Sequence, residues 1–140
     1  MSFGTQLREP VVSHGKFKWS ASQAIPGAML RHNGTTYLYY VAAAQNMPHE
    51  EAGGNTITGV AYCEAGDEAN PSSWTYHPEP VLVNSTFPGG WDNTSVFTNG
   101  ITVAPDGRFA MSFFGEPGMT ISFAFASTPL GIFIFIFHLL

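Results

Sequence analysis

Apolar and polar residues alternate along most of this chain, which is the pattern of β-strands with one buried face. No stretch repeats its apolar residues with the 3.6-residue period of a helix. The expected strands are Gly27–His32, Thr35–Ala44, Thr56–Glu64, a broken strand Trp74–Val83, Thr94–Ala104 as a strand pair or one bulged strand, Arg108–Gly115 and Thr120–Ser127. The pattern therefore predicts an all-β fold of antiparallel meanders.

Turn sequences separate these strands. Asn33-Gly34 between the first two strands is a strong hairpin signal, and "PDG" at Pro105–Gly107 precedes a later strand. The stretches Met47–Asn55 and Ala65–Ser73 read as polar loops. Short turns between consecutive strands indicate that neighbours in sequence also pair in space.

The chain contains an internal repeat. "GTTYLYYV" matches "GRFAMSFF", and "TITGVAYCEAGDEANPSSWTY" matches "TISFAFASTPLGIF" in the same order. This predicts two blade-like units, residues 23–83 and 91–133, within one partial propeller domain that spans residues 1–140. Residues 1–22 would form an N-terminal strand or extension, and residues 134–140 an apolar tail. Repeated meanders favour β-propeller blades; the alternative is an ordinary antiparallel sandwich with coincidental similarity.

Composition narrows the function classes. Charged residues make up only 11% of the chain, against about 25% in a typical soluble domain, and the net charge is −5. Without a basic stripe, a nucleic-acid partner is not expected. Cys63 is the only cysteine, so no internal disulfide can form.

The C-terminal stretch from Met119 to Leu140 has no Asp, Glu, Lys or Arg. Its length could span a bilayer, and a membrane-anchored β-domain is one alternative reading. Pro129, Gly131 and the β-branched and aromatic content favour strand instead, so no membrane partner is expected. The final "GIFIFIFHLL" has the composition of an aggregation-prone segment, and we expect self-association through it.

Several phrases, taken in order, resemble the five-bladed β-propeller glycosidases, chiefly glycoside hydrolase family 43, with families 32 and 68 as relatives. They are "AIPGAMLRHNGTTYLYYVAA", "ITGVAYCEAGDEANPSSWTY", "WDNTSVF", "PDGRFAMSFFGEPG" and, most specifically, "ASTPLGIF". The resemblance covers residues 23–133, about two blades of five. It implies that the chain is a truncated piece of such an enzyme.

The resemblance also implies a site. These enzymes place two catalytic carboxylates across a sugar-binding funnel, and family 43 adds a third that tunes the acid. Asp92 in "WDNTSVF" stands at the position of that tuning or transition-state-stabilising carboxylate; its alternative role is a turn or strand-start cap. Ile25-Pro26 stands where the family has its Asp-Pro general base. The family's general acid lies in the third blade.

Two more residues are candidates for substrate binding. Trp91 adjoins Asp92 and could stack on a sugar ring. Glu116 is expected on a loop after an aromatic strand, where it could face a sugar or simply be solvated. No metal and no cofactor are expected, because the five histidines lack metal-ligand spacing.

The resulting hypothesis is a fragment of a glycoside hydrolase that acts on O-glycosyl bonds of an arabinan- or xylan-type polysaccharide, or on a fructan. Ile25 at the base position predicts that the fragment itself is inactive. The alternative is a non-catalytic carbohydrate-binding or scaffold propeller. The start "MSFGTQLREP" has no apolar core and is not a signal peptide, although the full relatives are often secreted. The sequence assigns no cellular location.

Overall fold

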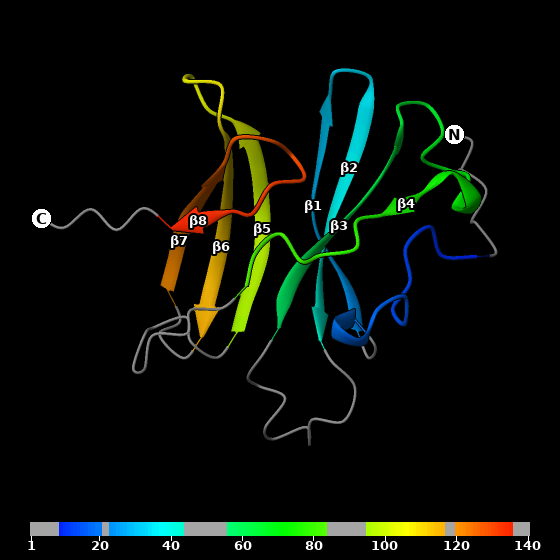
Figure 1. The fold of residues 1–140 in the computed structure, drawn as a ribbon, viewed down its shortest axis with the longest axis horizontal. Helices are drawn as coiled ribbons and strands as arrows, with labels where there is room; N and C mark the ends of the chain where they lie inside the picture. The colour runs from blue at the N-terminus through cyan, green and yellow to red at the C-terminus, as the bar shows by residue number, and fades with distance from the viewer. Residues whose placement is uncertain (1–8, 21–22, 44–55, 84–94, 117–119, 136–140) are drawn as a thin grey trace, which may run out of the picture.

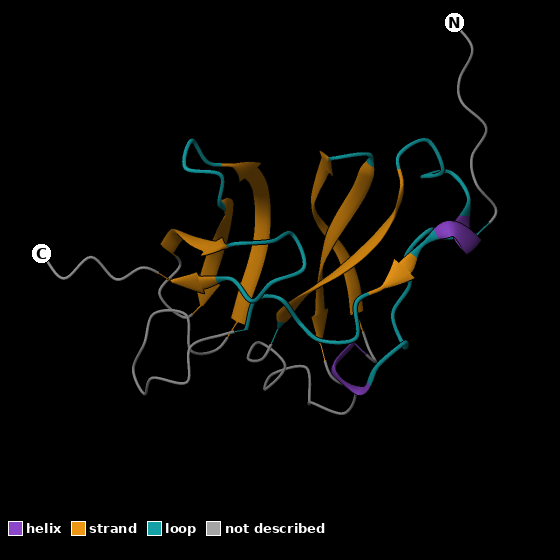
Figure 2. Ribbon diagram, turned by 45° about the horizontal axis from the view of Figure 1, so that its top comes forward, coloured by secondary structure: helices purple, strands orange, loops and turns teal. Residues whose placement is uncertain are grey.

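The computed structural model describes residues 9–20, 23–43, 56–83, 95–116 and 120–135. In these residues the chain forms two four-stranded antiparallel sheets, sheet A in the order β1-β2-β3-β4 and sheet B in the order β5-β6-β7-β8 (Figures 1 and 2). The strands are β1 (Gln23–His32), β2 (Thr35–Ala43), β3 (Ile57–Glu64), β4 (Thr75–Tyr76), β5 (Ser95–Val103), β6 (Phe109–Glu116), β7 (Thr120–Ala126) and β8 (Ile134–Phe135). The only helical pieces among the described residues are two 3-10 turns, Lys18–Ser20 and Pro71–Ser73. The predicted all-β, antiparallel class is confirmed.

Two of the expected strands differ from the prediction. β1 begins at Gln23, four residues earlier than expected, and includes Pro26. Proline is tolerated there because β1 is the edge strand of sheet A and needs no partner on its outer side. β4 keeps only two of the ten predicted residues. β5 is a single bulged strand, which was one of the two predicted alternatives. No helix in the described part of the chain is long and apolar enough to cross a membrane.

The two sheets repeat one another residue by residue. Each first strand carries a bulge, between Pro26 and Ala28 in β1 and between Thr98 and Gly100 in β5. Pro26 pairs with Tyr40, and Thr98 pairs with Phe113, so Tyr40 and Phe113 hold equivalent positions. The same alignment matches four further pairs, which are Tyr39 with Ser112, Leu38 with Met111, Val60 with Phe123, and Ala61 with Ala124.

The match of "GTTYLYYV" with "GRFAMSFF" is therefore correct in register. The match of the third strands is shifted by one residue. Gly59 pairs with Tyr40, and Ser122 pairs with Phe113, so Thr58 corresponds to Ile121 rather than to Ser122. The sequence match was misleading because both segments begin with "TI". The shift matters, because moving a strand by one residue places each side chain on the opposite face of the sheet.

The main core lies between the sheets. We call the face that carries Tyr40 or Phe113 the front face of each sheet, and the opposite face the back face. The back face of sheet A, with Tyr39 and Val60, packs against the front face of sheet B, with Phe113 and Met111. The connection after β4 crosses from sheet A toward β5 (Figure 1) and inserts two fully buried residues, Val81 and Leu82, into this core.

A second core covers the front face of sheet A. It contains Tyr40, Ala61 and Trp74, and the N-terminal residues Val11 and Trp19 pack on it. The described part of the predicted N-terminal extension thus contains no strand and lies against the front of sheet A. Each sheet consequently has a covered front face, as expected for neighbouring blades of a propeller.

The predicted boundary of the second unit needs a change. Ile134 and Phe135 form β8 and pair with Phe125 and Ala124 of β7. Phe133 is buried in the core between the sheets, and its N–H donates to the carbonyl of Val81. The second unit therefore extends to Phe135, into the segment that was expected to be an apolar tail.

Candidate functional site

The first strands of the two sheets lie side by side and run in the same direction (Figure 1). Their contact is close, because a methyl group on Gly27 would lie 2.8 Å from the carbonyl oxygen of Thr98. β1 and β5 therefore begin at the same end of the molecule. We call this the strand-start end. It is the end at which the resemblance places catalytic carboxylates.

Threonine side chains fix the beginning of β5. The hydroxyl of Thr56 donates to the carbonyl of Val96 at 3.1 Å, and the N–H of Val96 donates back to Thr56 at 3.2 Å. Two residues further along each strand, the hydroxyls of Thr58 and Thr98 lie 2.7 Å apart in a buried contact. These contacts hold the first residues of β5 in place.

The two main site candidates fall outside the described residues. Trp91 and Asp92 precede Ser95, the first residue of β5, by four and three positions. Glu116 is the last residue of β6 and pairs with Ser95, so its backbone ends a strand instead of lying on the expected loop. Its side chain is not among those described. Glu116 and the beginning of β5 therefore share the strand-start end.

Ile25, the residue at the position of the family's general base, lies in β1 opposite Val41. Its side chain is 47% exposed. An alkyl side chain cannot accept a proton, so this position of β1 contributes no acid or base.

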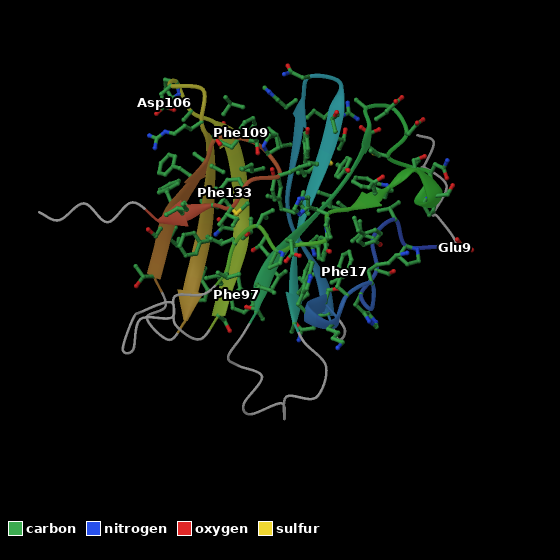
Figure 3. All side chains as sticks on the ribbon, viewed as in Figure 1. Glu9, Phe17, Phe97, Asp106, Phe109 and Phe133 are labelled. Carbon is green, nitrogen blue, oxygen red and sulfur yellow. The ribbon has the colours of Figure 1, made fainter. Side chains whose placement is uncertain are left out.

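The carboxylates of Asp106 and Glu68, which each make several polar contacts, lie at the opposite end of the sheets. Asp106 lies in the β5–β6 turn, far from Phe97 near the start of β5 (Figure 3). Its carboxylate accepts from the backbone N–H of Arg108 at 3.0 Å and pairs with the Arg108 guanidinium at 2.7 Å. The guanidinium and this N–H lower the pKa of Asp106. These contacts stabilise a turn, as the sequence indicated for Asp106.

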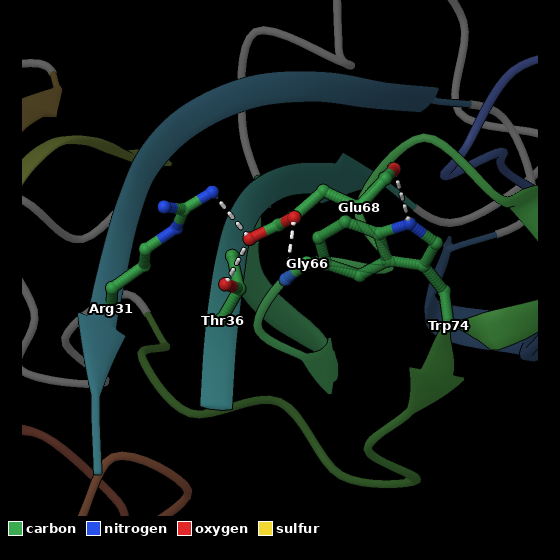
Figure 4. Close-up of polar contacts among 5 residues, drawn as sticks. All are labelled: Arg31, Thr36, Gly66, Glu68 and Trp74. Atoms are coloured by element: carbon green, nitrogen blue, oxygen red, sulfur yellow. Dashed lines mark hydrogen bonds and ion pairs between the residues drawn. The ribbon is translucent and has the colours of Figure 1, made fainter. Parts of the chain in front are cut away.

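Glu68 lies at the centre of a cluster of polar contacts (Figure 4). Its Oε1 accepts from the Thr36 hydroxyl at 2.6 Å and pairs with Arg31 at 2.7 Å, and its Oε2 accepts from the N–H of Gly66 at 2.9 Å. These donors, Thr36 first, lower the pKa of Glu68 to about 2. The Glu68 carbonyl accepts from the Trp74 indole N–H at 3.1 Å.

Glu68 is thus a structural residue. A lowered pKa often marks an active site, but here both carboxylate oxygens are occupied by donors from the protein. Its position in the polar loop Ala65–Ser73 does not by itself indicate this role. No local signal could have revealed it, because its partners lie on β1, β2 and its own loop and meet only in the folded sheet.

The cavity at the front of sheet A does not suit a sugar. It has a volume of about 230 Å³ and is lined by Pro10, Val11, Val12, Ala24, Pro26, Leu38 and Tyr40. A sugar needs several hydrogen-bond partners, and this lining is almost entirely apolar. The Tyr40 hydroxyl is buried without a hydrogen-bond partner, and it lies over Gly59 on the β3 side of the ring. Burial raises its pKa.

Two of the three tryptophans lie in the packing of sheet A. Trp74 is buried, and Trp19 stacks on Phe17 and on Tyr40. Among the described residues, no group of three or more His, Cys, Asp and Glu side chains is arranged to hold a metal ion.

Comparisons with known proteins support the fold. No protein-family model matches the chain, and no curated protein matches it in sequence. Nine chains of solved structure match. One is an alpha-L-arabinofuranosidase from Lactobacillus brevis, with a TM-score of 0.55 and 19% sequence identity over 86% of this chain. At that identity the likeness concerns the fold. The match covers 40% of the arabinofuranosidase, so this chain is similar to two-fifths of that protein.

Proposed function

We propose that this chain forms two neighbouring blades of a five-bladed β-propeller glycoside hydrolase of the family 43 type. The substrate class would be an arabinan- or xylan-type polysaccharide, with a fructan as the choice if the family 32 relatives are nearer. Asp92 would tune the catalytic acid or stabilise the transition state. Trp91 and Glu116 would contact the sugar.

One observation carries this proposal: the two sheets repeat the same bulged register and together resemble part of an arabinofuranosidase. The order of the repeated phrases in the sequence agrees with it. The shared strand-start end of β1 and β5 supports a site there, because Asp92 stands three residues before the anchored Ser95.

A carbohydrate-binding propeller without catalysis is the second candidate. Ile25 favours it, because the position of the general base holds an alkyl side chain. Both candidates expect sugar binding at the strand-start end, and they differ in whether the whole protein hydrolyses the sugar. A glutamate at the acid position of a third blade, sought in the genomic sequence downstream, would favour the enzyme.

Sugar binding tests the common part of both candidates. Arabino- and xylo-oligosaccharides would be titrated into the chain by isothermal calorimetry. We expect Trp91→Ala and Asp92→Ala to weaken binding at least tenfold. Asp106→Asn, at the opposite end, should leave it unchanged. Equal binding by all three variants, or no binding by the wild type, would reject the site.

Hydrolysis tests the catalytic part. We expect the 140-residue chain to release no nitrophenol from aryl arabinofuranosides or xylosides. Ile25→Asp alone should not create activity, because the acid of a third blade is also required. Turnover by the purified wild-type chain would overturn the proposed role of Ile25.

A further inference from the structure

The sequence contains two Asn-Gly pairs, Asn33-Gly34 and Asn99-Gly100. Asparagine is a chemically labile residue. It is most labile when glycine follows, because no side chain then hinders the backbone nitrogen that attacks the asparagine amide. A β-branched residue follows each pair, so the two have closely similar local chemistry. A large difference in their reactivity therefore has to come from the fold.

Asn33-Gly34 forms the two-residue turn between β1 and β2, at the outer end of the hairpin (Figure 1). Both residues are exposed, and both have positive φ, 48° and 76°. Among the described residues, the Asn33 side chain has no hydrogen bond or ring contact, and a methyl group on Gly34 would meet no atom within 4 Å. The turn projects from the end of sheet A and not from a face, so a blade packed on either face leaves it accessible.

Asn99-Gly100 is held within β5. Asn99 is the extra residue of the bulge, and its Oδ1 accepts a hydrogen bond from the Ser112 hydroxyl at 2.6 Å. Gly100 pairs with Ser112, and a methyl group on Gly100 would lie 2.5 Å from the same hydroxyl. Ser112 thus fixes the amide and crowds the glycine. A reaction between Asn99 and Gly100 requires β5 to separate from β6, and a paired strand opens less readily than a turn.

We propose that Asn33 is a site of spontaneous deamidation and that the fold protects Asn99 from the same reaction. The backbone nitrogen of Gly34 forms a bond to Cγ of Asn33 as the bond from Cγ to Nδ2 breaks, and the proton of that nitrogen leaves with ammonia. Water then opens the cyclic imide at either carbonyl, which gives aspartate or isoaspartate. The net reaction consumes water and releases ammonia. This proposal does not depend on the proposed enzymatic function.

The modification affects a turn that is tied to the rest of sheet A. The Gly34 carbonyl accepts from the N–H of Ala65 at 2.9 Å, so the turn is bonded to the loop that follows β3. That loop already carries Asp67 and Glu68, and the product adds a carboxylate beside it. Isoaspartate also places an additional carbon in the backbone of a two-residue turn, whose length fixes the strand register. We therefore expect the isoaspartyl product to be less stable than the original chain.

Incubation of the folded 140-residue chain at mildly alkaline pH, followed by peptide mapping with mass spectrometry, tests the site. The conversion of an amide to an acid changes the peptide mass, and chromatography separates the aspartyl from the isoaspartyl peptide. We expect deamidation at Asn33 to be at least tenfold faster than at Asn99. In concentrated urea the two rates should agree within about threefold, because the fold no longer protects either site. A folded chain in which Asn33 reacts no faster than Asn99 overturns the proposal.

Two variants sharpen the comparison. Ser112→Ala removes the hydroxyl that holds Asn99, so deamidation at Asn99 should rise at least threefold while the rate at Asn33 stays the same. An unchanged rate at Asn99 would refute the protection by Ser112. Asn33→Asp has the charge of the product without the additional backbone carbon. It should melt above the isoaspartyl chain purified by ion exchange, and equal melting of the two would refute the effect on the turn.

Discussion

Sheets A and B have the same strand order, the same bulge and the same pairing register. Among the described residues, however, sheet A buries both of its faces, whereas the back face of sheet B exposes Ile121 and Phe123. In sheet A, Tyr39 is fully buried and its hydroxyl donates to the carbonyl of Pro129 at 2.8 Å. The equivalent residue in sheet B is Ser112, which bonds Asn99 at the exposed surface. The repeated sequence gives both sheets the same backbone pairing. Which side chains are buried, and therefore stabilise the fold, depends on what packs against each face.

The largest difference in unfolding free energy should appear when Tyr39 and its equivalent Ser112 are each replaced by a smaller side chain. Tyr39→Ser removes a buried ring and its hydrogen bond, so we expect a loss of about 3–5 kcal/mol in unfolding free energy. Ser112→Ala should cost less than about 1 kcal/mol, because its hydrogen bond is exposed. Urea denaturation followed by tryptophan fluorescence would measure both. Similar losses in the two variants would mean that the sheets do not pack as described.

The bulges offer a second test of the same comparison. A methyl group on Gly27 would meet two backbone oxygens, those of Thr98 at 2.8 Å and Tyr39 at 3.1 Å. Neither can move without shifting a strand, so Gly27→Ala should cost about 1–3 kcal/mol. In sheet B the bulge residue is Asn99, exposed and already bearing a side chain. Asn99→Ala should cost less than about 1 kcal/mol. Equal stability of the two variants would contradict the close contact of β1 and β5.

Cys63 and Ala126 form a third equivalent pair, because they face Thr36 and Phe109. Cys63→Ala should cost about 1 kcal/mol, the value of one small apolar group. Burial raises the pKa of the Cys63 thiol, with Glu68 and Asp67 adding to the shift. We therefore expect its reaction with a disulfide reagent to be slow in the folded chain and fast in urea. Rapid reaction of the native chain would show that sheet A opens readily.

The smallest effect concerns the stability of the fold at acid pH. The folded pKa of Glu68 is about 2, below its ordinary value of 4.5. Its contacts therefore stabilise the fold fully above pH 4.5, and this contribution is lost as the pH falls toward 2. Glu68→Gln should lower the melting temperature slightly at pH 7 and flatten its fall between pH 4.5 and 2. Asp106→Asn should change the curve less, because it affects one exposed turn. Parallel acid curves for wild type and Glu68→Gln would refute the role of these contacts.

Local pattern was sufficient for the strands and turns. Alternation with period two and the glycine turns at Gly34 and Gly107, both with positive φ, predicted the hairpins of both sheets. These signals depend on neighbours in sequence, so they can be read without a fold. The short strands β4 and β8 were misjudged, since they pair over only two residues and depend on the strand beside them.

The prediction of the candidate site has a different basis from the prediction of the strands. Asp92 and Trp91 rest on motif likeness, and what the described structure adds is the anchored beginning of β5 through Thr56 and Val96. The glycosidase resemblance predicted a fold that the arabinofuranosidase match supports. It did not specify the sugar, because a fold by itself does not determine which ligand a site binds.

The sequence by itself determined the all-β class, the internal repeat and the two hairpins that turn at Gly34 and Gly107. Tertiary structure alone decided that a side chain on Gly27 would clash with β5, that Glu68 is fully paired and that the two back faces differ in exposure. The physical reason is distance along the chain. Strand and turn propensities act between residues a few positions apart. The Gly27–Thr98, Thr36–Glu68 and Tyr39–Pro129 contacts join residues that meet only once the sheets have packed.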